Sequence, residues 1–142
     1  AGTVWLAIDD ADEDNSAMRF IPGTHDKGAL EMQATGEGNV FHKETAGAEE
    51  MGTPFTNVLK AGQMSMHADM LVHGSLANKS DRRRCGLTLR YCPPEVEITE
   101  PSWANGVEAI LCRGEAGAWK THPRPTNNDI TKSQSPHVVG NN

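Results

Sequence analysis

Residues 62–94 read GQMSMHADMLVHGSLANKSDRRRCGLTLRYCPP, and this stretch decides the fold. It predicts two β-strands, the first running through His73 and Ser75 and the second starting near Arg84, with a polar turn at residues 76–81 between them. Because side chains at i and i+2 of a strand share a face, we expect His73 and Ser75 to point together. The turn then folds Arg84 back beside them.

The three side chains have complementary chemistry. The imidazole of His73 suits a transition metal. The planar guanidinium of Arg84 can hold a carboxylate through two parallel hydrogen bonds. A metal ligand beside a carboxylate clamp indicates a metal enzyme that uses a small carboxylate co-substrate.

These residues also carry a resemblance. The pattern His73-Gly74-Ser75, followed by NKSDRRR at residues 78–84 and GLTLRY at 86–91, resembles the C-terminal signature of the phytanoyl-CoA dioxygenase family. That family is a branch of the Fe(II)- and 2-oxoglutarate-dependent oxygenases. A second block, VWLAIDD at residues 4–10 and DNSAMRFIPGTH at 14–25, resembles its tryptophan strand, its acidic-Asn-Gly turn and its Pro-Gly-Ser-His segment. Ser16 and Thr24 depart from that pattern, standing where the family has Gly and Ser.

The resemblance implies a site as well as a fold. His73 takes the place of the distal iron histidine, and Arg84, 11 residues later, takes the place of the arginine that binds the distal carboxylate of 2-oxoglutarate. Ser75 would assist Arg84, and Trp5 would line the 2-oxoglutarate pocket. The implied cofactors are Fe(II) and 2-oxoglutarate, with O2 and a small organic molecule as the other reactants. The reaction would release succinate and CO2.

Each of these residues also has an ordinary structural interpretation. A lone strand histidine is usually structural, an arginine such as Arg84 can form a surface ion pair, and the indole of Trp5 can be a core side chain. We expect Asn15 to fix its own turn rather than to touch a ligand. In the basic triplet at residues 82–84, Arg82 and Arg83 are expected to lie in a solvated turn. Arg90 shares a face with Arg84 and has no assigned role.

The rest of the iron triad is not evident. The only His-x-Asp runs from His67 to Asp69. On the same strand as His73, its histidine would lie about 20 Å away at about 3.3 Å per residue, too far for one ion to bind both. His67 and Asp69 share parity with His73, so we expect them on the same face in a core or supporting role rather than as metal ligands. In the family the His-x-Asp precedes the tryptophan strand, so we expect the two missing ligands before Ala1. The chain alone is therefore expected to be inactive.

Strand-like segments separated by turns predict an all-β fold. They lie at residues 3–8, 18–21, 55–59 and 109–112. Residues 26–53 are expected to form a long loop that shapes the substrate pocket, with a short strand at 39–42. The resemblance implies a double-stranded β-helix, a cupin-like jelly roll. Residues 1–120 would be the C-terminal part of one such oxygenase domain, and 121–142 a loosely ordered tail.

The outward faces of two predicted strands are strongly apolar. If Trp5 and Arg84 point inward, then Val4, Leu6 and Ile8, and likewise Leu87, Leu89 and Tyr91, point outward. Such faces need a cover, and in the family N-terminal helices lie over that sheet. The domain is therefore expected to be incomplete, without its N-terminal helices and strands.

Composition narrows the class of protein. The 142 residues carry a formal net charge of −6, which argues against non-specific nucleic-acid binding. Three cysteines without a CxxC pair argue against a disulfide scaffold or a cysteine zinc site. No apolar run is long enough to cross a bilayer, and no secretion signal is evident, so the expected location is the cytoplasm.

Three functions remain open at this stage. The first is an Fe(II)- and 2-oxoglutarate-dependent dioxygenase acting on a small substrate that the sequence does not identify. The second is a non-catalytic jelly-roll module that has lost its iron triad and still binds a carboxylate. The third, a cupin-like metal enzyme that modifies sugars, is disfavoured because it leaves the Arg84 clamp without a purpose. Oligomeric state is not predicted.

Overall fold

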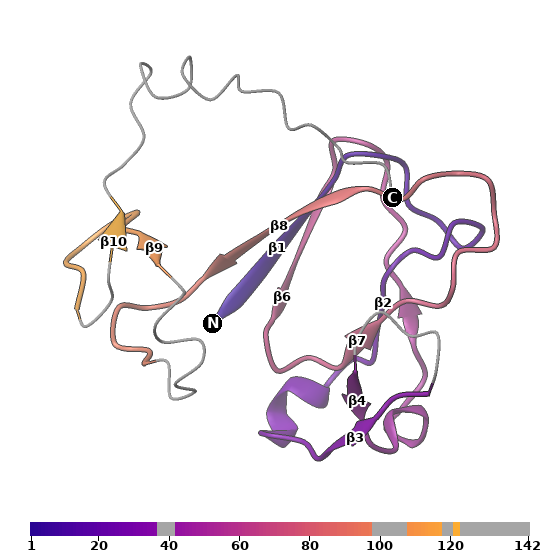
Figure 1. Ribbon diagram of the computed structural model, residues 1–142, viewed down its shortest axis with the longest axis horizontal. Helices are drawn as coiled ribbons and strands as arrows, with labels where there is room; N and C mark the ends of the chain where they lie inside the picture. Colours follow the sequence, from indigo (N-terminus) through magenta and orange to yellow (C-terminus); the bar gives the residue numbers. More distant parts are fainter. Residues whose placement is uncertain (37–41, 98–107, 118–120, 123–142) are drawn as a thin grey trace, which may run out of the picture. The chain divides into compact units, whose positions relative to one another are not determined.

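The computed structural model describes residues 1–36, 42–97, 108–117 and 121–122 (Figure 1). The chain divides into two compact units, Ala1–Cys92 and Pro93–Asn142, which are described separately. The first unit carries the tryptophan strand and residues 62–92 of the stretch at 62–94. The prediction of a single domain over residues 1–120 stays a prediction.

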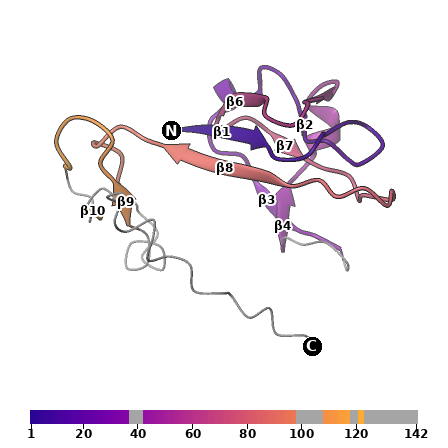
Figure 2. The same cartoon turned by 90° about the horizontal axis from the view of Figure 1, so that it is seen from above.

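Strand β1 (Gly2–Ala7) is the centre of the larger sheet. It pairs antiparallel with β6 (Met64–Ala68) on one side and with β8 (Gly86–Tyr91) on the other, so the three strands lie side by side (Figures 1 and 2). Thr3, Trp5 and Ala7 are buried on the inner face, as their shared parity predicts. The strand predicted at residues 3–8 is thereby confirmed.

A second three-stranded sheet lies against this inner face. Its order is β5 (Phe55–Thr56), β2 (Arg19–Phe20) and β7 (His73–Gly74), all antiparallel. The two sheets meet where the ring centroid of Phe20 lies 4.8 Å from that of His67. The core beside this contact contains Trp5 and small side chains, namely Ala7, Ala11 and Ala17. Two packed antiparallel sheets confirm the prediction of an all-β fold.

The first strand of the predicted central pair is in fact two strands. The chain leaves the larger sheet after Ala68, turns with a hydrogen bond from Leu71 N–H to the Ala68 carbonyl (3.1 Å), and enters the second sheet as β7. His67 and His73 therefore face each other across the two sheets, with ring centroids 5.0 Å apart. The predicted separation of about 20 Å is wrong, because it assumed one extended strand.

The segment at residues 26–53 is more structured than a loop. After a 3₁₀ turn at Thr24–Lys27, it forms the antiparallel pair β3 (Met32–Ala34) and β4 (Lys43–Thr45), followed by a second 3₁₀ turn at Ala48–Glu50. The long loop was therefore a wrong prediction. Residues 39–41 of the strand predicted at 39–42 lie outside the described part of the chain.

The second unit contributes a short parallel pair. Strand β9 (Ala109–Ile110) pairs with β10 (Thr121–His122). The strand predicted at residues 109–112 is confirmed over its first two positions. Residues 123–142 of the predicted loose tail lie outside the described part of the chain.

The outer face of the larger sheet is apolar and open to solvent. Met66 is 77% exposed, Met64 66%, Tyr91 50% and Leu87 47%, and together with Leu89 they form one continuous face across β6, β1 and β8. The middle strand is better covered, since Val4 is only 9% exposed. This confirms the predicted apolar face. Among the described residues, no helix has the length and apolar character needed to span a membrane.

Thr24 ties the entry of β7 to the end of β2. Its fully buried hydroxyl donates to the Ile21 carbonyl (2.8 Å) and accepts from Val72 N–H (2.9 Å). Val72 immediately precedes His73, so this hydroxyl fixes the backbone that presents the imidazole.

We predict that Thr24→Val lowers the free energy of unfolding by about 1–3 kcal/mol, because the isosteric side chain leaves a buried N–H without an acceptor. Urea unfolding of the protein measures this. Thr24→Ser is the matched control, since it keeps both hydrogen bonds and loses only a methyl group. Equal losses in the two variants would show that the hydroxyl does not matter.

Candidate active site

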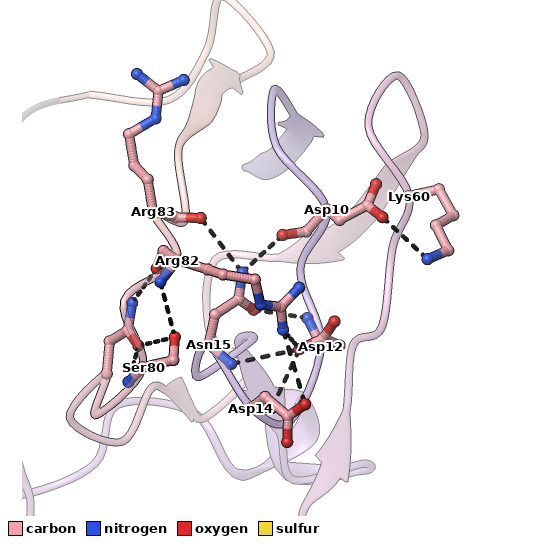
Figure 3. Close-up of polar contacts among 9 residues, drawn as sticks. Asp10, Asp12, Asp14, Asn15, Lys60, Ser80, Arg82 and Arg83 are labelled. Atoms are coloured by element: carbon pink, nitrogen blue, oxygen red, sulfur yellow. Dashed lines mark hydrogen bonds and ion pairs between the residues drawn. The ribbon is translucent and has the colours of Figure 1, made fainter.

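An acidic turn stands next to the start of β8. Asn15, 1% exposed, holds the turn together: its Oδ1 accepts from Asp12 N–H (2.8 Å), and its Nδ2 donates to the carbonyls of Asp10 (2.8 Å) and Arg83 (3.3 Å) (Figure 3). The structural role predicted for Asn15 is confirmed. Ser16 follows in a left-handed conformation with a φ of 62°, which explains why a glycine suits this position.

The acidic turn pairs with the first two arginines of the basic triplet. Arg82 contacts Asp12, and its guanidinium also lies 3.9 Å from an Asp14 oxygen (Figure 3). Arg83 donates two hydrogen bonds of 2.8 Å to the two oxygens of Asp9. Arg82 and Arg83 are exposed but paired, which corrects the prediction of a solvated turn.

Asp9 also positions the strand that follows the triplet. Its carboxylate accepts from Cys85 N–H (2.8 Å), one residue after Arg84. The hydrogen bond from Arg83, and next the one from Cys85, hold the pKa of Asp9 below its ordinary value of 3.8. Asp9 is therefore ionised at neutral pH and fixes the backbone on both sides of Arg84.

Arg84 is the arginine of the triplet that the acidic turn leaves unpaired. Its Nε is buried without a hydrogen-bond partner, and within the described ranges it forms no ion pair. The surface ion pair that was the structural alternative for Arg84 is therefore not seen there. A buried guanidinium donor without an acceptor is rare in proteins and is what a site for an anionic ligand provides.

Trp5 lies on the inner face of β1. Its indole covers Gly86, where an added Cβ would come within 2.2 Å of the ring. Trp5 is 4% exposed and belongs to the core cluster, so it packs as a core residue. Its role as a wall of the 2-oxoglutarate pocket stays a prediction.

His73 presents one free ring nitrogen. Its Nδ1 lies 2.7 Å from the Leu71 carbonyl, and since a carbonyl only accepts, Nδ1 donates. The side chain is exposed, and the lone pair of Nε2 remains available. Histidines that bind metals are commonly held in this way, with the second ring nitrogen bound to a carbonyl.

His67 adds a second imidazole to the same place. It is 8% exposed, packs against the rings of Phe20 and His73, and has a buried Nδ1 without a partner. Burial, and then the neighbouring side chains of His73 and Arg90, lower its pKa from the ordinary value of 6.5. His67 is therefore neutral at pH 7.

The described residues supply only part of a metal site. Among them there is no group of three His, Cys, Asp or Glu that could hold a metal ion. Asp69, the acidic member of the His-x-Asp, points elsewhere, with its carboxylate 3.6 Å from the Ala1 nitrogen. Ser75 is exposed just beyond β7, and no hydrogen bond joins His73, Ser75 and Arg84 in this part of the chain.

Sequence reasoning missed two contributors to this site. Asp9 could have been found from the opposite charges of residues 9–14 and 82–84, which can pair if the two segments lie side by side. Gly86 was marked by a glycine inside a strand, which often allows close approach of another group. His67 was expected on the same face as His73, but its contact with His73 was not, because that proximity depends on the turn after Ala68.

A match between this sequence and a protein-family model identifies the family. The model for phytanoyl-CoA dioxygenase matches residues 1–86, more than half of the chain. The chain belongs to the phytanoyl-CoA dioxygenase family. As a member of this family, it shares the fold that the resemblance implied.

Individual relatives of this family agree. Phytanoyl-CoA dioxygenase domain-containing protein 1 of Danio rerio is 31% identical over 75% of this chain, and that of Bos taurus is 32% identical over 69%. The chain covers 38% and 35% of these relatives. Among solved structures, the non-heme monooxygenase ThoJ in its apo form matches 92% of the chain with a TM-score of 0.70 and 28% identity. The chain spans 49% of that structure. The double-stranded β-helix is thereby confirmed.

We predict that Asp9→Asn destabilises this family member at pH 7, because it loosens the bonds to Arg83 and Cys85. Asp9 has a lowered pKa when folded, so its contribution is complete above pH 3.8 and is lost as the pH falls through the lower folded pKa. The stability difference between wild type and variant should therefore shrink below pH 3.8, measured by urea unfolding at several pH values. Asp81→Asn, in an exposed turn, is the control and should show no such trend.

We further predict that Gly86→Ala costs about 1–3 kcal/mol of stability, because the new methyl group displaces the Trp5 indole. Urea unfolding again provides the measurement. Gly74→Ala is the matched control, since an added Cβ at that strand position meets nothing within 4 Å. Equal stability of the two variants would contradict the close packing of Trp5 on Gly86.

Proposed function

We propose that these residues form part of an Fe(II)- and 2-oxoglutarate-dependent dioxygenase that oxidises a small organic substrate. Membership of the phytanoyl-CoA dioxygenase family and likeness to a non-heme monooxygenase support an oxygenase. The observation that carries the finer proposal is Arg84, a cation whose buried Nε has no partner while its neighbours Arg82 and Arg83 are both neutralised.

Arg84 fits the distal carboxylate of 2-oxoglutarate. A guanidinium binds a carboxylate through two parallel, charge-assisted hydrogen bonds, and such a ligand would satisfy the orphaned donor. Asp9 fixes the backbone at Cys85, which keeps Arg84 directed at the pocket without neutralising it. Ser75 would add a hydroxyl donor, and the Trp5 indole would shield the ion pair from water.

His73 fits one position of an iron centre. Its donated Nδ1–H sets the tautomer in which Nε2 can bind a metal. A facial triad needs a second histidine and a carboxylate. We propose that both come from outside the described residues, since these provide no suitable group of three.

The chemistry follows from these roles. When bound, Fe(II) and O2 supply the oxidising chemistry, in which 2-oxoglutarate yields succinate and CO2 and one oxygen atom enters the substrate. The chain itself orients the co-substrate through Arg84 and presents a metal ligand through His73. The expected partners are the small-molecule substrate and O2, and the expected location is the cytoplasm.

A carboxylate-binding module without catalysis is the second candidate. It is favoured by one observation, that the described residues contain an unpaired arginine but no complete metal site. Such a module would bind 2-oxoglutarate equally well with and without iron, and it would release no succinate.

We predict that Arg84→Lys weakens 2-oxoglutarate binding by about 10- to 100-fold, because a point charge replaces two parallel hydrogen bonds. Calorimetry with 2-oxoglutarate measures the affinity. Arg113→Lys, an exposed arginine in the second unit, is the matched control and should bind normally. Unchanged affinity in Arg84→Lys would contradict the assignment of the carboxylate site.

Succinate release separates the two candidate functions. An oxygenase loses its iron-dependent succinate release in His73→Gln while keeping its iron-free affinity for 2-oxoglutarate. A binding module releases no succinate even as wild type. If two ligands lie outside these 142 residues, the chain on its own binds 2-oxoglutarate without turnover, and succinate release is then measured on a longer protein that supplies those ligands.

A further inference from the structure

One row of side chains on the inner sheet face has no role in the chemistry above. Thr3 on β1 stands directly opposite His67 on β6 and directly opposite Arg90 on β8. Side chains of directly opposed residues lie on the same face, with Cβ atoms about 4.5–5.5 Å apart. His67, Thr3 and Arg90 therefore form a row across the sheet about 10 Å long.

His67 supplies a buried donor or acceptor that lacks a partner. The side chain is more than nine-tenths buried, at 8% exposure, and its Nδ1 has no hydrogen bond with any described residue. Leaving such an atom unpaired costs about 1–3 kcal/mol. The ring packs against Phe20 and His73 and therefore points between the two sheets, toward the site rather than toward solvent.

Arg90 supplies a positive charge without a counter-ion. Its side chain is exposed, and it forms no ion pair with a described residue. The six strands of the two facing sheets contain no Asp or Glu at all. Their ionisable side chains, apart from Tyr91, are the basic ones Arg19, His67, His73 and Arg90. The sheet face at this row, which is open to solvent at Arg90, is therefore complementary to an anion.

The row differs from the Arg84 site. Arg84 and Arg90 are six positions apart on the same side of the chain, and β8 extends about 13 Å from Gly86 to Arg90 alone. One small carboxylate group cannot reach both. His67 also touches His73, so the row lies beside the residue that we assign to iron, whereas Arg84 lies at the opposite end of β8.

We propose that His67, Thr3 and Arg90 form a subsite for an anionic group, a carboxylate or a phosphate, of the primary substrate. The guanidinium provides the charge, the Thr3 hydroxyl lies at the centre of the row, and His67 donates through an N–H of its neutral ring. This subsite gives the proposed oxygenase a substrate class, namely small anionic molecules. The proposal rests on the oxygenase function only in taking the bound anion to be part of the substrate.

The position of the row also limits the substrate. An anion held by His67 lies close to His73, because the two rings are 5.0 Å apart by their centroids. The carbon that is oxidised must therefore be only a few bonds from the anionic group. A short organic acid or a small phosphorylated molecule fits this requirement, and a long chain with a remote acidic group does not.

The test uses acetate and inorganic phosphate as probes. Each is titrated into the 142-residue protein without iron, and binding is followed by the ring nitrogen and proton signals of His67 in NMR spectra. We predict that at least one probe shifts these signals, and that Arg90→Gln weakens its binding about 10-fold or more. Lys79→Gln removes the same charge from an exposed turn and should leave binding unchanged.

A second pair of variants separates this subsite from the co-substrate site. Thr3→Val should weaken the probe, while Arg84→Gln should leave it bound and weaken 2-oxoglutarate instead. The preferred probe distinguishes a carboxylate from a phosphate substrate. The proposal is overturned if neither probe shifts the His67 signals, or if Arg90→Gln binds as well as wild type. Probe binding that depends on Arg90 in a protein that does not bind 2-oxoglutarate would retain the subsite and reject the 2-oxoglutarate-dependent oxygenase.

Discussion

The register of β1 determines which side chains reach the interior. β1 is hydrogen-bonded on both sides, so a single alternation sets the facing of β6 and β8 as well. Trp5 and Thr3 face inward together with His67 and Arg90, while the leucines and methionines of the same strands face outward. A shift of one residue would exchange the two sets completely. The inward-facing side chains proposed to bind ligands and the apolar outer face are thus two consequences of one pairing.

The acidic turn pairs with two of the three arginines at residues 82–84 and leaves the third, Arg84, without a counter-ion among the described residues. Arg82 and Arg83 lie before β8 rather than in it. Asp12 binds Arg82, and Asp9 binds Arg83. Exposed pairs of this kind add little stability by themselves. These ion pairs hold the segment before Arg84 and occupy the carboxylates of Asp12 and Asp9, while the hydrogen bond from Cys85 N–H to Asp9 fixes the backbone after Arg84.

The sequence predicted the inner and outer faces well, because side chains alternate between the two faces of β1 and β8 regardless of what packs against these strands. It also indicated the family from short blocks around His73 and Trp5. It failed at the turn after Ala68, because the apolar residues at 70–72 continue the strand-like pattern and no Gly or Pro interrupts it. Distances inferred from an unbroken strand were therefore wrong. The proximity of His67 to His73 depends on the tertiary structure and cannot be inferred from the alternation of side chains along a strand.

The outer face of the larger sheet has a practical consequence for handling the protein. Met64 and Met66 on β6 and Leu87 on β8 are exposed on either side of β1, on the same face of the sheet, and apolar surface of this kind promotes self-association. Salts such as sulfate strengthen the burial of apolar surface, so they favour that association. Solubility should accordingly fall with protein concentration and with such salts, and it should be governed by this one face rather than by the net charge of −6.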